Sequence, residues 1–184
     1  MIINSLYNYY RIIESDLPTW GFKEEDVSFA LNLSPDGDVL DVIPLYTQEG
    51  RRRIPKKIQV PARRDPRTVN IIADFLYGNS KYVLGIGDEE DVRRPERIKE
   101  CYDKMKELHI SLLEGIDDIG AKAVLGYFKR NTPDTLRNNP KISSYLDELR
   151  SGSNIVFMLD GDAEFIHQRE VLQKIWLDYL NNNV

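Results

Sequence analysis

Hydrophobic positions in the first half of the chain recur at every second residue, which is the periodicity of a β-strand. Apolar side chains at positions 27, 29, 31 and 33 flank small or polar ones, and this alternation predicts a half-buried strand. Residues 34–38 read Ser-Pro-Asp-Gly-Asp, in which proline and glycine favour the backbone angles of a turn. A return strand over 39–45 would complete a hairpin, and residues 77–86 predict a further strand with a bulge at Gly78.

A helical periodicity of three and four residues replaces this alternation after residue 88, and it also occurs once before the strands, over 2–14. The later helices are predicted over about 95–112, 117–130, 133–138, 141–150 and 167–180, and a short apolar strand over 154–159. The predicted fold class is therefore α+β, in a single domain. A mostly antiparallel sheet would form in residues 1–90, and residues 91–184 would be rich in helix.

Composition narrows the class of protein. With 184 residues, of which 41% are hydrophobic, the chain can bury a sizeable core. No apolar run reaches the roughly 18 residues of a membrane helix, and the N-terminus is too polar for a signal peptide. Cys101 is the single cysteine, which excludes an intrachain disulfide and fits a reducing compartment. These features predict a cytoplasmic protein that does not associate with a membrane.

Charge is unevenly distributed along the chain. Residues 51–67 carry a net charge of +7, although the whole chain has a net charge of −5. The basic residues of this segment are Arg51, Arg52, Arg53, Lys56, Lys57, Arg63, Arg64 and Arg67. Prolines at 55, 61 and 66 exclude a helix and would confine a strand to the edge of a sheet. Such a segment is either a binding site for a polyanion, most simply a nucleic-acid backbone, or an ordinary solvated edge.

The aromatic segment that follows, residues 74–87, contains polar side chains in its middle. Its aromatic residues Phe75, Tyr77 and Tyr82 are predicted to lie in the core. The polar residues Asn79, Ser80 and Lys81 follow a glycine and predict an exposed tip, from which amide and ammonium groups could reach base edges. The alternative is a plain turn, because Gly-Asn-Ser is also typical of turns.

Candidate catalytic residues are few. Asp160, Asp162 and Glu164 lie near His167 in sequence, and a metal-dependent nuclease could use such carboxylates. Asp-Gly-Asp is more typical of a hairpin turn, and His109 and Cys101 fall on an apolar helical stripe that suits structural roles. No nucleophile–base pair and no metal-ligand spacing stands out. The sequence therefore predicts no enzymatic activity, no metal and no cofactor.

Four stretches, taken together, resemble the N-terminal part of the large subunit of the type I-C CRISPR Cascade complex, the Csd family. They are residues 1–10, 27–31, 75–85, and 154–161 followed by the helix around Trp176. The likeness covers nearly the whole chain in order, although the family pattern has Trp-Asp in place of Tyr77-Gly78. Since members of this family are much longer, the resemblance implies an N-terminal piece of a longer subunit.

The resemblance also implies partners and a role. Such subunits contact the guide RNA handle, the target double-stranded DNA beside its protospacer-adjacent motif, other Cascade subunits, and the helicase-nuclease that degrades the target. Cleavage belongs to that nuclease, while base pairing with the guide reads the target sequence. On this basis the eight basic residues are expected to line a phosphate track, and Asn79, Ser80 and Lys81 to probe the motif. The rival hypotheses are a scaffold whose basic strip touches only guide RNA, and the metal nuclease described above.

Overall fold

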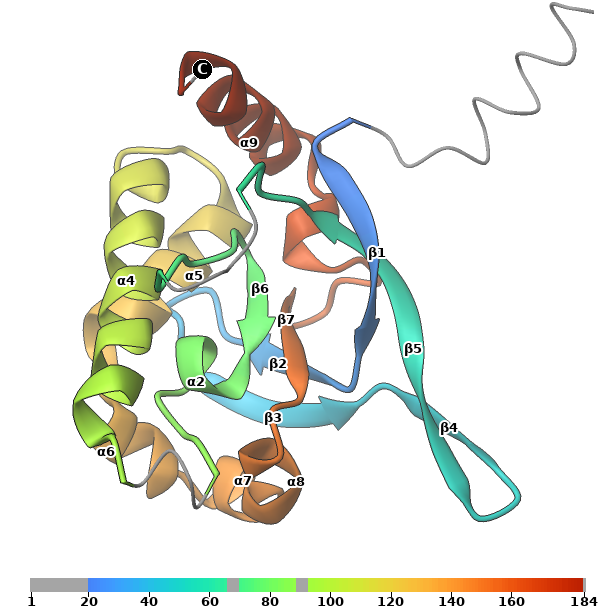
Figure 1. Cartoon of the computed structure of the whole chain (residues 1–184). Coiled ribbons are helices and arrows are strands. Elements are labelled where there is room, and N and C mark those ends of the chain that lie inside the picture. Colours follow the sequence, from blue (N-terminus) through green and yellow to red (C-terminus); the bar gives the residue numbers. More distant parts are fainter. Residues whose placement is uncertain (1–19, 66–69, 89–92, 184) are drawn as a thin grey trace, which may run out of the picture.

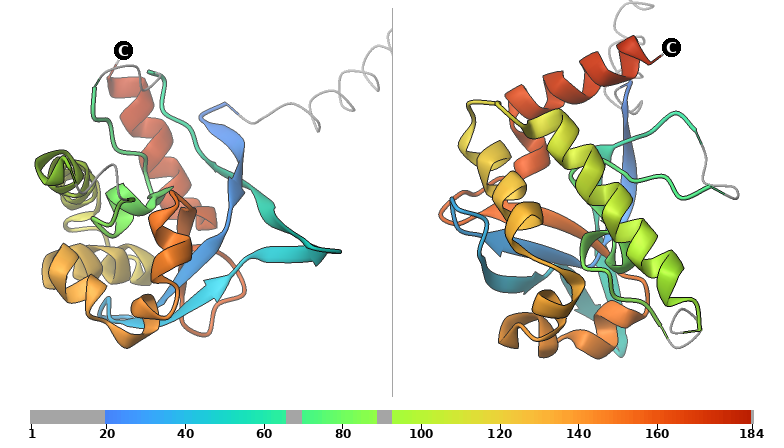
Figure 2. Two further views of the ribbon diagram at one scale, coloured as in Figure 1. Left: turned by 60° about the horizontal axis from the view of Figure 1, so that its bottom comes forward. Right: turned by 90° about the vertical axis from the view of Figure 1, so that its left-hand side faces the viewer.

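The computed structural model describes residues 20–65, 70–88 and 93–183, so the predicted helix over 2–14 and Arg67 lie outside the described residues. Strands and helices segregate as predicted, which confirms the α+β class (Figure 1). Within the described part of the chain the strands form two sheets, and the helices gather on one side of the molecule (Figure 2).

The first sheet contains strands from both halves of the sequence. Its order is β3 (Val39–Pro44), β2 (Phe29–Leu33), β7 (Asn154–Leu159) and β6 (Tyr77–Asn79). The β2–β3 hairpin is antiparallel, as predicted, and β7 pairs with β6 in the same sense. β7 lies parallel to β2, with Phe29 beside Ile155, so this sheet is mixed. A strand some 120 residues later in the sequence thus completes a sheet that the N-terminal half begins.

Strand β2 is buried on both faces, so the prediction of a half-buried strand is wrong. Phe29 and Leu31 face the main core, whereas Ala30 faces a second apolar cluster. That cluster contains Ile58 and Val60, which come from the other sheet. The alternation in the sequence is real, but the smaller Ala30 is buried because the second sheet covers its face.

The second sheet holds the basic segment. Its order is β1 (Phe22–Val27), β5 (Arg52–Pro61) and β4 (Tyr46–Glu49). The prediction that the basic segment is extended is confirmed, but it lies between two strands and not at a simple edge. Residues 52–55 pair with β4 and residues 56–61 pair with β1, so each residue of β5 has one registered partner. Pro55 and Pro61 are tolerated because no position has to pair on both sides.

Helix boundaries follow the sequence signals closely. The helices after residue 93 are α4 (Pro95–Leu113), α5 (Ile119–Arg130), α6 (Pro133–Arg137), α7 (Pro140–Ser143), α8 (Leu146–Arg150) and α9 (Glu170–Asn182). Asp118 caps α5 by accepting a hydrogen bond from the Ala121 amide, and Thr132 caps α6 in the same way. The helix predicted over 141–150 is divided at Ser144 into α7 and α8.

The strand predicted over 77–86 ends early. β6 stops at Asn79, and a single helical turn, α2 (Ser80–Val83), follows. The Asn79 side chain accepts a hydrogen bond from the Lys81 amide at 3.1 Å and so starts this turn. The bulge predicted at Gly78 is also wrong, because β6 and β7 pair in continuous register.

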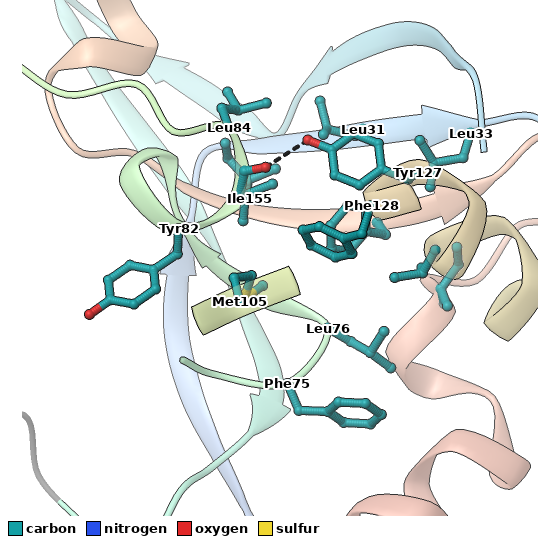
Figure 3. Close-up of a cluster of buried hydrophobic side chains, with 14 of the residues drawn as sticks. Leu31, Leu33, Phe75, Leu76, Tyr82, Leu84, Met105, Tyr127, Phe128 and Ile155 are labelled. Atoms are coloured by element: carbon teal, nitrogen blue, oxygen red, sulfur yellow. Dashed lines mark hydrogen bonds between the residues drawn. The ribbon is translucent and has the colours of Figure 1, made fainter. Parts of the chain in front are cut away.

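The main core joins the two sheets to the helices (Figure 3). Phe75 stacks on Trp176 of α9, and Tyr127 of α5 donates a hydrogen bond from its hydroxyl to the Val83 carbonyl at 2.7 Å. The predicted burial of Phe75, Tyr77 and Tyr82 is confirmed. These contacts hold the aromatic segment inside the molecule, and Tyr77 also packs in the second cluster with Ile58 and Val60 of β5.

Candidate nucleic-acid interface

The β4–β5 hairpin extends away from the body of the molecule (Figure 1). Its turn carries basic residues. Gly50 has a φ of 62°, which places the turn in the left-handed region that glycine adopts without strain. The next two residues, Arg51 and Arg52, are exposed and make no ion pair with any residue that the structure describes. The hairpin therefore presents two unneutralised guanidinium groups on a narrow two-stranded ribbon.

Arg53 connects the hairpin to helix α8. Its guanidinium donates to the Glu148 carboxylate of α8 at 2.9 Å and to the Tyr46 hydroxyl at 3.1 Å, and it lies 5.0 Å from the Tyr46 ring centroid. The Tyr46 hydroxyl also donates to Glu148, and these two partners lower the pKa of that carboxyl group. Arg53 therefore has a role in orienting the ribbon.

The lysines in the middle of β5 differ in how far they are neutralised. Lys57 Nζ lies 3.6 Å from carboxylate oxygens of both Glu24 and Asp26 on β1. Lys56 Nζ lies 5.9 Å from the centroid of the Phe165 ring and makes no ion pair in the described part of the chain. Exposed ion pairs contribute little to stability, so a phosphate could displace the carboxylates from Lys57.

Arg63 and Arg64 point to different environments. The Arg63 guanidinium pairs with Asp74, whose side chain is only 3% exposed, and also donates to the Asp65 carbonyl at 2.9 Å. Arg63 is thus a structural residue whose removal would take an arginine partner away from a buried carboxylate. Arg64 instead lies over the Trp20 ring, 5.5 Å from its centroid.

The structure does not bring the predicted basic residues together as one open track. Arg53, Lys57 and Arg63 have carboxylate partners, whereas Arg51, Arg52, Lys56 and Arg64 have none among the described residues. These four also lie far apart, with two at the hairpin turn and one beyond the other end of β5. Sequence reasoning missed this division and also missed the turn at Gly50, for which the glycine itself is a signal.

The exposed tip predicted for Asn79, Ser80 and Lys81 is not observed. Ser80 is fully buried, and its Oγ has no hydrogen-bond partner in the described structure. Asn79 and Lys81 are partly buried, and the Asn79 amide is engaged in capping α2. Asn79 is the last residue of β6 and pairs with Asn154 of β7, and Ser80 and Lys81 begin the helical turn α2. Reading of a DNA motif by these residues stays a prediction.

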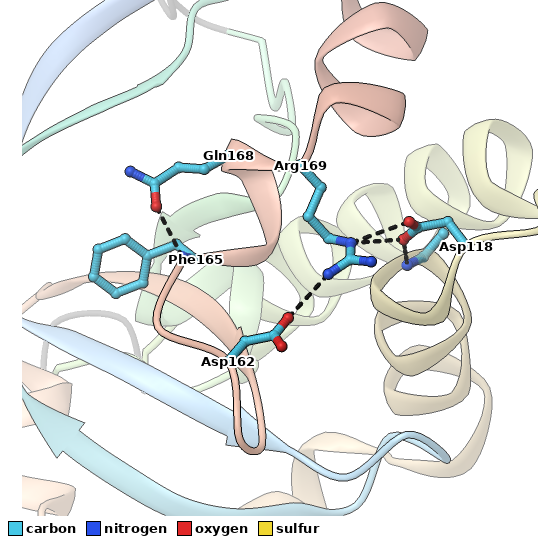
Figure 4. Close-up of polar contacts among 6 residues, drawn as sticks. Asp118, Asp162, Phe165, Gln168 and Arg169 are labelled. Carbon is cyan, nitrogen blue, oxygen red and sulfur yellow. Dashed lines mark hydrogen bonds and ion pairs between the residues drawn. The ribbon is translucent and has the colours of Figure 1, made fainter.

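The acidic turn after β7 is built from ion pairs and hydrogen bonds within the protein (Figure 4). Asp162 pairs with Arg169 at 2.9 Å, and the same guanidinium contacts both oxygens of Asp118. Asp160 accepts a hydrogen bond from Asn32 at 2.9 Å. Among the described residues no group of histidine, cysteine, aspartate or glutamate side chains has the arrangement of a metal site. The interpretation of Asp160–Asp162 as a turn is supported by the bond from the Asp162 amide to the Leu159 carbonyl at 3.0 Å.

Both histidines of the chain are buried. The Leu76 amide donates to His109 Nε2 at 2.9 Å, and His109 Nδ1 lies 2.7 Å from the Met105 carbonyl oxygen. His167 Nε2 lies 2.9 Å from the Gln59 carbonyl oxygen of β5. Desolvation lowers the pKa of each imidazole to about 4. The contacts of His109 are thus consistent with the structural role predicted for it. Cys101 is buried, which is consistent with the structural role predicted for that residue too.

Comparison with known proteins adds one positive finding. A family model described as CRISPR-associated protein (Cas_Csd1) matches residues 6–184. Comparison with curated proteins returned no match. In the part of the chain that the structure describes, no helix has the length and apolar character needed to cross a lipid bilayer.

Proposed function

The chain belongs to the Cas_Csd1 family of CRISPR-associated proteins, and from this premise we propose that it binds nucleic acid within a CRISPR effector complex. Specifically, we propose the role of the large subunit of a type I-C Cascade complex. That subunit would contact the target duplex beside its protospacer-adjacent motif, assist duplex opening and touch the guide RNA handle. It would leave cleavage to the recruited helicase-nuclease and carry no catalytic site of its own.

The β4–β5 hairpin is the observation that carries this proposal. A two-stranded β-ribbon has the width that the major groove of DNA admits. Arg51 and Arg52 lie at the turn of such a ribbon without carboxylate partners in the described structure, and guanidinium groups pair well with phosphates and with guanine edges. The part-buried hydrogen bond from Tyr46 to Glu148, with Arg53 on the same carboxylate, would restrict the directions of the ribbon, which reduces the entropy lost on binding.

Contact with the motif by Asn79 and Lys81 is a second part of the proposal. Both side chains are partly exposed, whereas Ser80 is buried. A direct contact by Ser80 would require α2 to move, so we assign any base contact in this segment to its two neighbours. The hairpin and this segment would then act on the same duplex, the first through charge and the second through hydrogen bonds.

Salt-dependent binding tests the hairpin. Replacement of Arg51 and Arg52 by glutamine should weaken binding to a short duplex. It should also reduce the slope of log affinity against log salt by about 1.8, since each phosphate contact contributes about 0.9. The matched control is the Arg93→Gln/Arg94→Gln variant, which removes the same charge from two adjacent exposed arginines just before α4. This control should change the slope little.

Two outcomes would contradict the proposal. One is a hairpin variant that keeps the parent affinity and slope. The other is a control variant that loses as much as the hairpin variant, because binding would then follow net charge alone. If photo-crosslinking from the hairpin in the assembled complex captures guide RNA or protein subunits and no target DNA, the scaffold hypothesis takes its place.

A further inference from the structure

Trp20 is an exposed aromatic residue next to the basic strand. At 54% exposure it is the most exposed large apolar side chain in the described part of the chain. The Arg64 guanidinium lies 5.5 Å from its ring centroid, within the range of a cation–π interaction. Tryptophan and arginine are among the residue types most enriched among those that contribute binding energy at interfaces.

The backbone on both sides of this pair is held firmly. Gly21, which follows Trp20, accepts a hydrogen bond from Trp176 Nε1 at 3.0 Å and another from the Ala62 amide at 2.8 Å. Arg63, which precedes Arg64, is anchored by its buried ion pair with Asp74. The exposed ring and guanidinium are therefore each next to a residue that is bonded to a buried side chain, Trp176 or Asp74, which is the arrangement expected of a preorganised site.

We propose that Trp20 and Arg64 form a stacking site for an unpaired nucleotide. An indole ring stacks on any nucleobase, and the guanidinium beside it can bind the adjoining phosphate or extend the stack. A shallow pocket of about 120 Å³ lies beside Arg64 and is lined in part by Tyr179 and Asn183. Because the Asn183 amide donates to the Tyr179 carbonyl at 2.7 Å, the side-chain oxygen of Asn183 is the group that this pocket offers to a neighbouring nucleotide.

The position of this site suits the opening of a duplex, and in this respect the inference rests on the proposed function. The hairpin turn and the Trp20–Arg64 pair lie at opposite ends of β5, because Glu49 pairs with Arg52 at the turn and Phe22 pairs with Pro61 at the other end. Figure 1 shows the course of β5 between these ends. The ten residues of this strand span about 30 Å. A duplex held at the hairpin and a displaced single strand held at Trp20 would thus occupy separate regions of one surface, with Lys56 between them.

Tryptophan fluorescence gives a direct test, because the chain has two tryptophans and Trp176 is only 1% exposed. Titration with an eight-nucleotide oligothymidylate should quench the fluorescence of Trp20. An abasic phosphodiester of the same length should bind through phosphate without quenching. Trp20→Ala should weaken oligothymidylate binding about 5- to 150-fold, the range found for loss of one base–aromatic stack. Trp20→Phe should retain much of the affinity and lose the quenching.

The matched control is Val171→Ala, which trims another apolar side chain that is about half exposed, on α9. It should leave affinity and quenching unchanged. The inference is overturned if Trp20→Ala binds oligothymidylate as the parent does, or if the abasic chain quenches equally. It is also overturned if Trp20→Ala releases a protein subunit from the complex while single-strand binding is intact.

The hairpin variant separates this inference from the proposed function. Replacement of Arg51 and Arg52 should leave the quenching of Trp20 by oligothymidylate unchanged. Normal duplex binding by that variant together with normal quenching would overturn the hairpin proposal and leave the stacking site standing. Trp20→Phe loses the quenching in either case, because it removes the fluorophore. If Trp20→Ala nevertheless binds oligothymidylate with the parent affinity, the stacking site is overturned and the hairpin proposal stands.

Discussion

Lowering the pH from 7.5 to 5 is expected to reduce the free energy of unfolding of this protein by about 4 kcal/mol, because both of its histidines are buried in the neutral form. The Leu76 amide can only donate, so His109 Nε2 must accept, and its Nδ1 carries the proton that is donated to Met105. Protonation of His109 would break the bond to Leu76 and bury an unpaired charge.

The contacts of His167 require the tautomer opposite to that of His109. Its Nε2 lies against a carbonyl oxygen and must donate, so the unprotonated nitrogen is Nδ1. This atom is buried and has no hydrogen-bond partner in the described structure. Protonation there would add a buried donor without an acceptor. Desolvation therefore lowers the pKa of both imidazoles.

The sign and magnitude follow from linkage. The folded-state pKa of each histidine is lowered to about 4, from 6.5 in the unfolded chain. The unfolded chain thus binds more protons between these values, and stability is lost as the pH falls below 6.5. Each histidine contributes a loss of about 2 kcal/mol at pH 5, and the loss levels off near pH 4.

Urea denaturation at several pH values between 7.5 and 5 measures this loss. Between pH 6 and pH 5 the parent should lose about 2 kcal/mol, and His109→Gln and His167→Gln should each lose about 1 kcal/mol over the same interval. The slope against pH is the readout, so a variant that is less stable overall remains informative. Single variants that keep the full parent slope would refute the assignment of the acid sensitivity to these imidazoles.

Three further substitutions test the structural interpretation. Arg63→Ala leaves the Asp74 carboxylate without its arginine and should reduce the free energy of unfolding by about 3 kcal/mol, measured by urea denaturation, whereas Arg63→Met combined with Asp74→Leu should lose less. Asn79→Ala removes the cap of α2 and should cost about 1 kcal/mol of unfolding free energy in the same assay. Asn79→Ser keeps a capping oxygen and should not have this cost. Any loss of preference for motif-bearing DNA in Asn79→Ser would therefore report a contact made by the Asn79 amide itself. Gly37→Ala would place a Cβ 2.2 Å from the Tyr127 amide nitrogen at a φ of 94° and should reduce the free energy of unfolding by more than about 2 kcal/mol. Gly50→Ala has open space around the new Cβ and should reduce it by about 1 kcal/mol. Equal melting temperatures for the two variants would contradict this difference.

Helices in the second half of the chain were predictable because their signals are local. Pro95 starts α4, Thr132 and Pro133 start α6, and an apolar stripe at helical spacing continues between such signals. The turn α2 begins at a single capping hydrogen bond to Asn79. Asn79, Ser80 and Lys81 would fit an exposed loop equally well, so the sequence could not distinguish the two. The strand predicted there was wrong because the segment with Tyr82 and Val83 packs as a helical turn against α4 and does not pair with β7.

The candidate interface was predictable in its charge and not in its geometry. Composition located the basic segment and its extended backbone, and the resemblance in four stretches indicated the family that the comparison then showed. The pairing of Arg53 with Glu148 joins residues 95 positions apart, and local sequence contains no sign of it. For the same reason the contact between Trp20 and Arg64 could not be anticipated.

The sequence by itself determined the α+β class, the position of the β2–β3 hairpin, most helix boundaries and the place where positive charge is concentrated. These properties depend on periodicity, capping residues and charge, which act over a few neighbouring positions. Only the tertiary structure decided that β7 lies parallel to β2, that Ala30 faces a second apolar cluster, and which arginines are neutralised. Those outcomes depend on which distant segment packs against a given face, because burial and ion pairing are set by contacts across the fold.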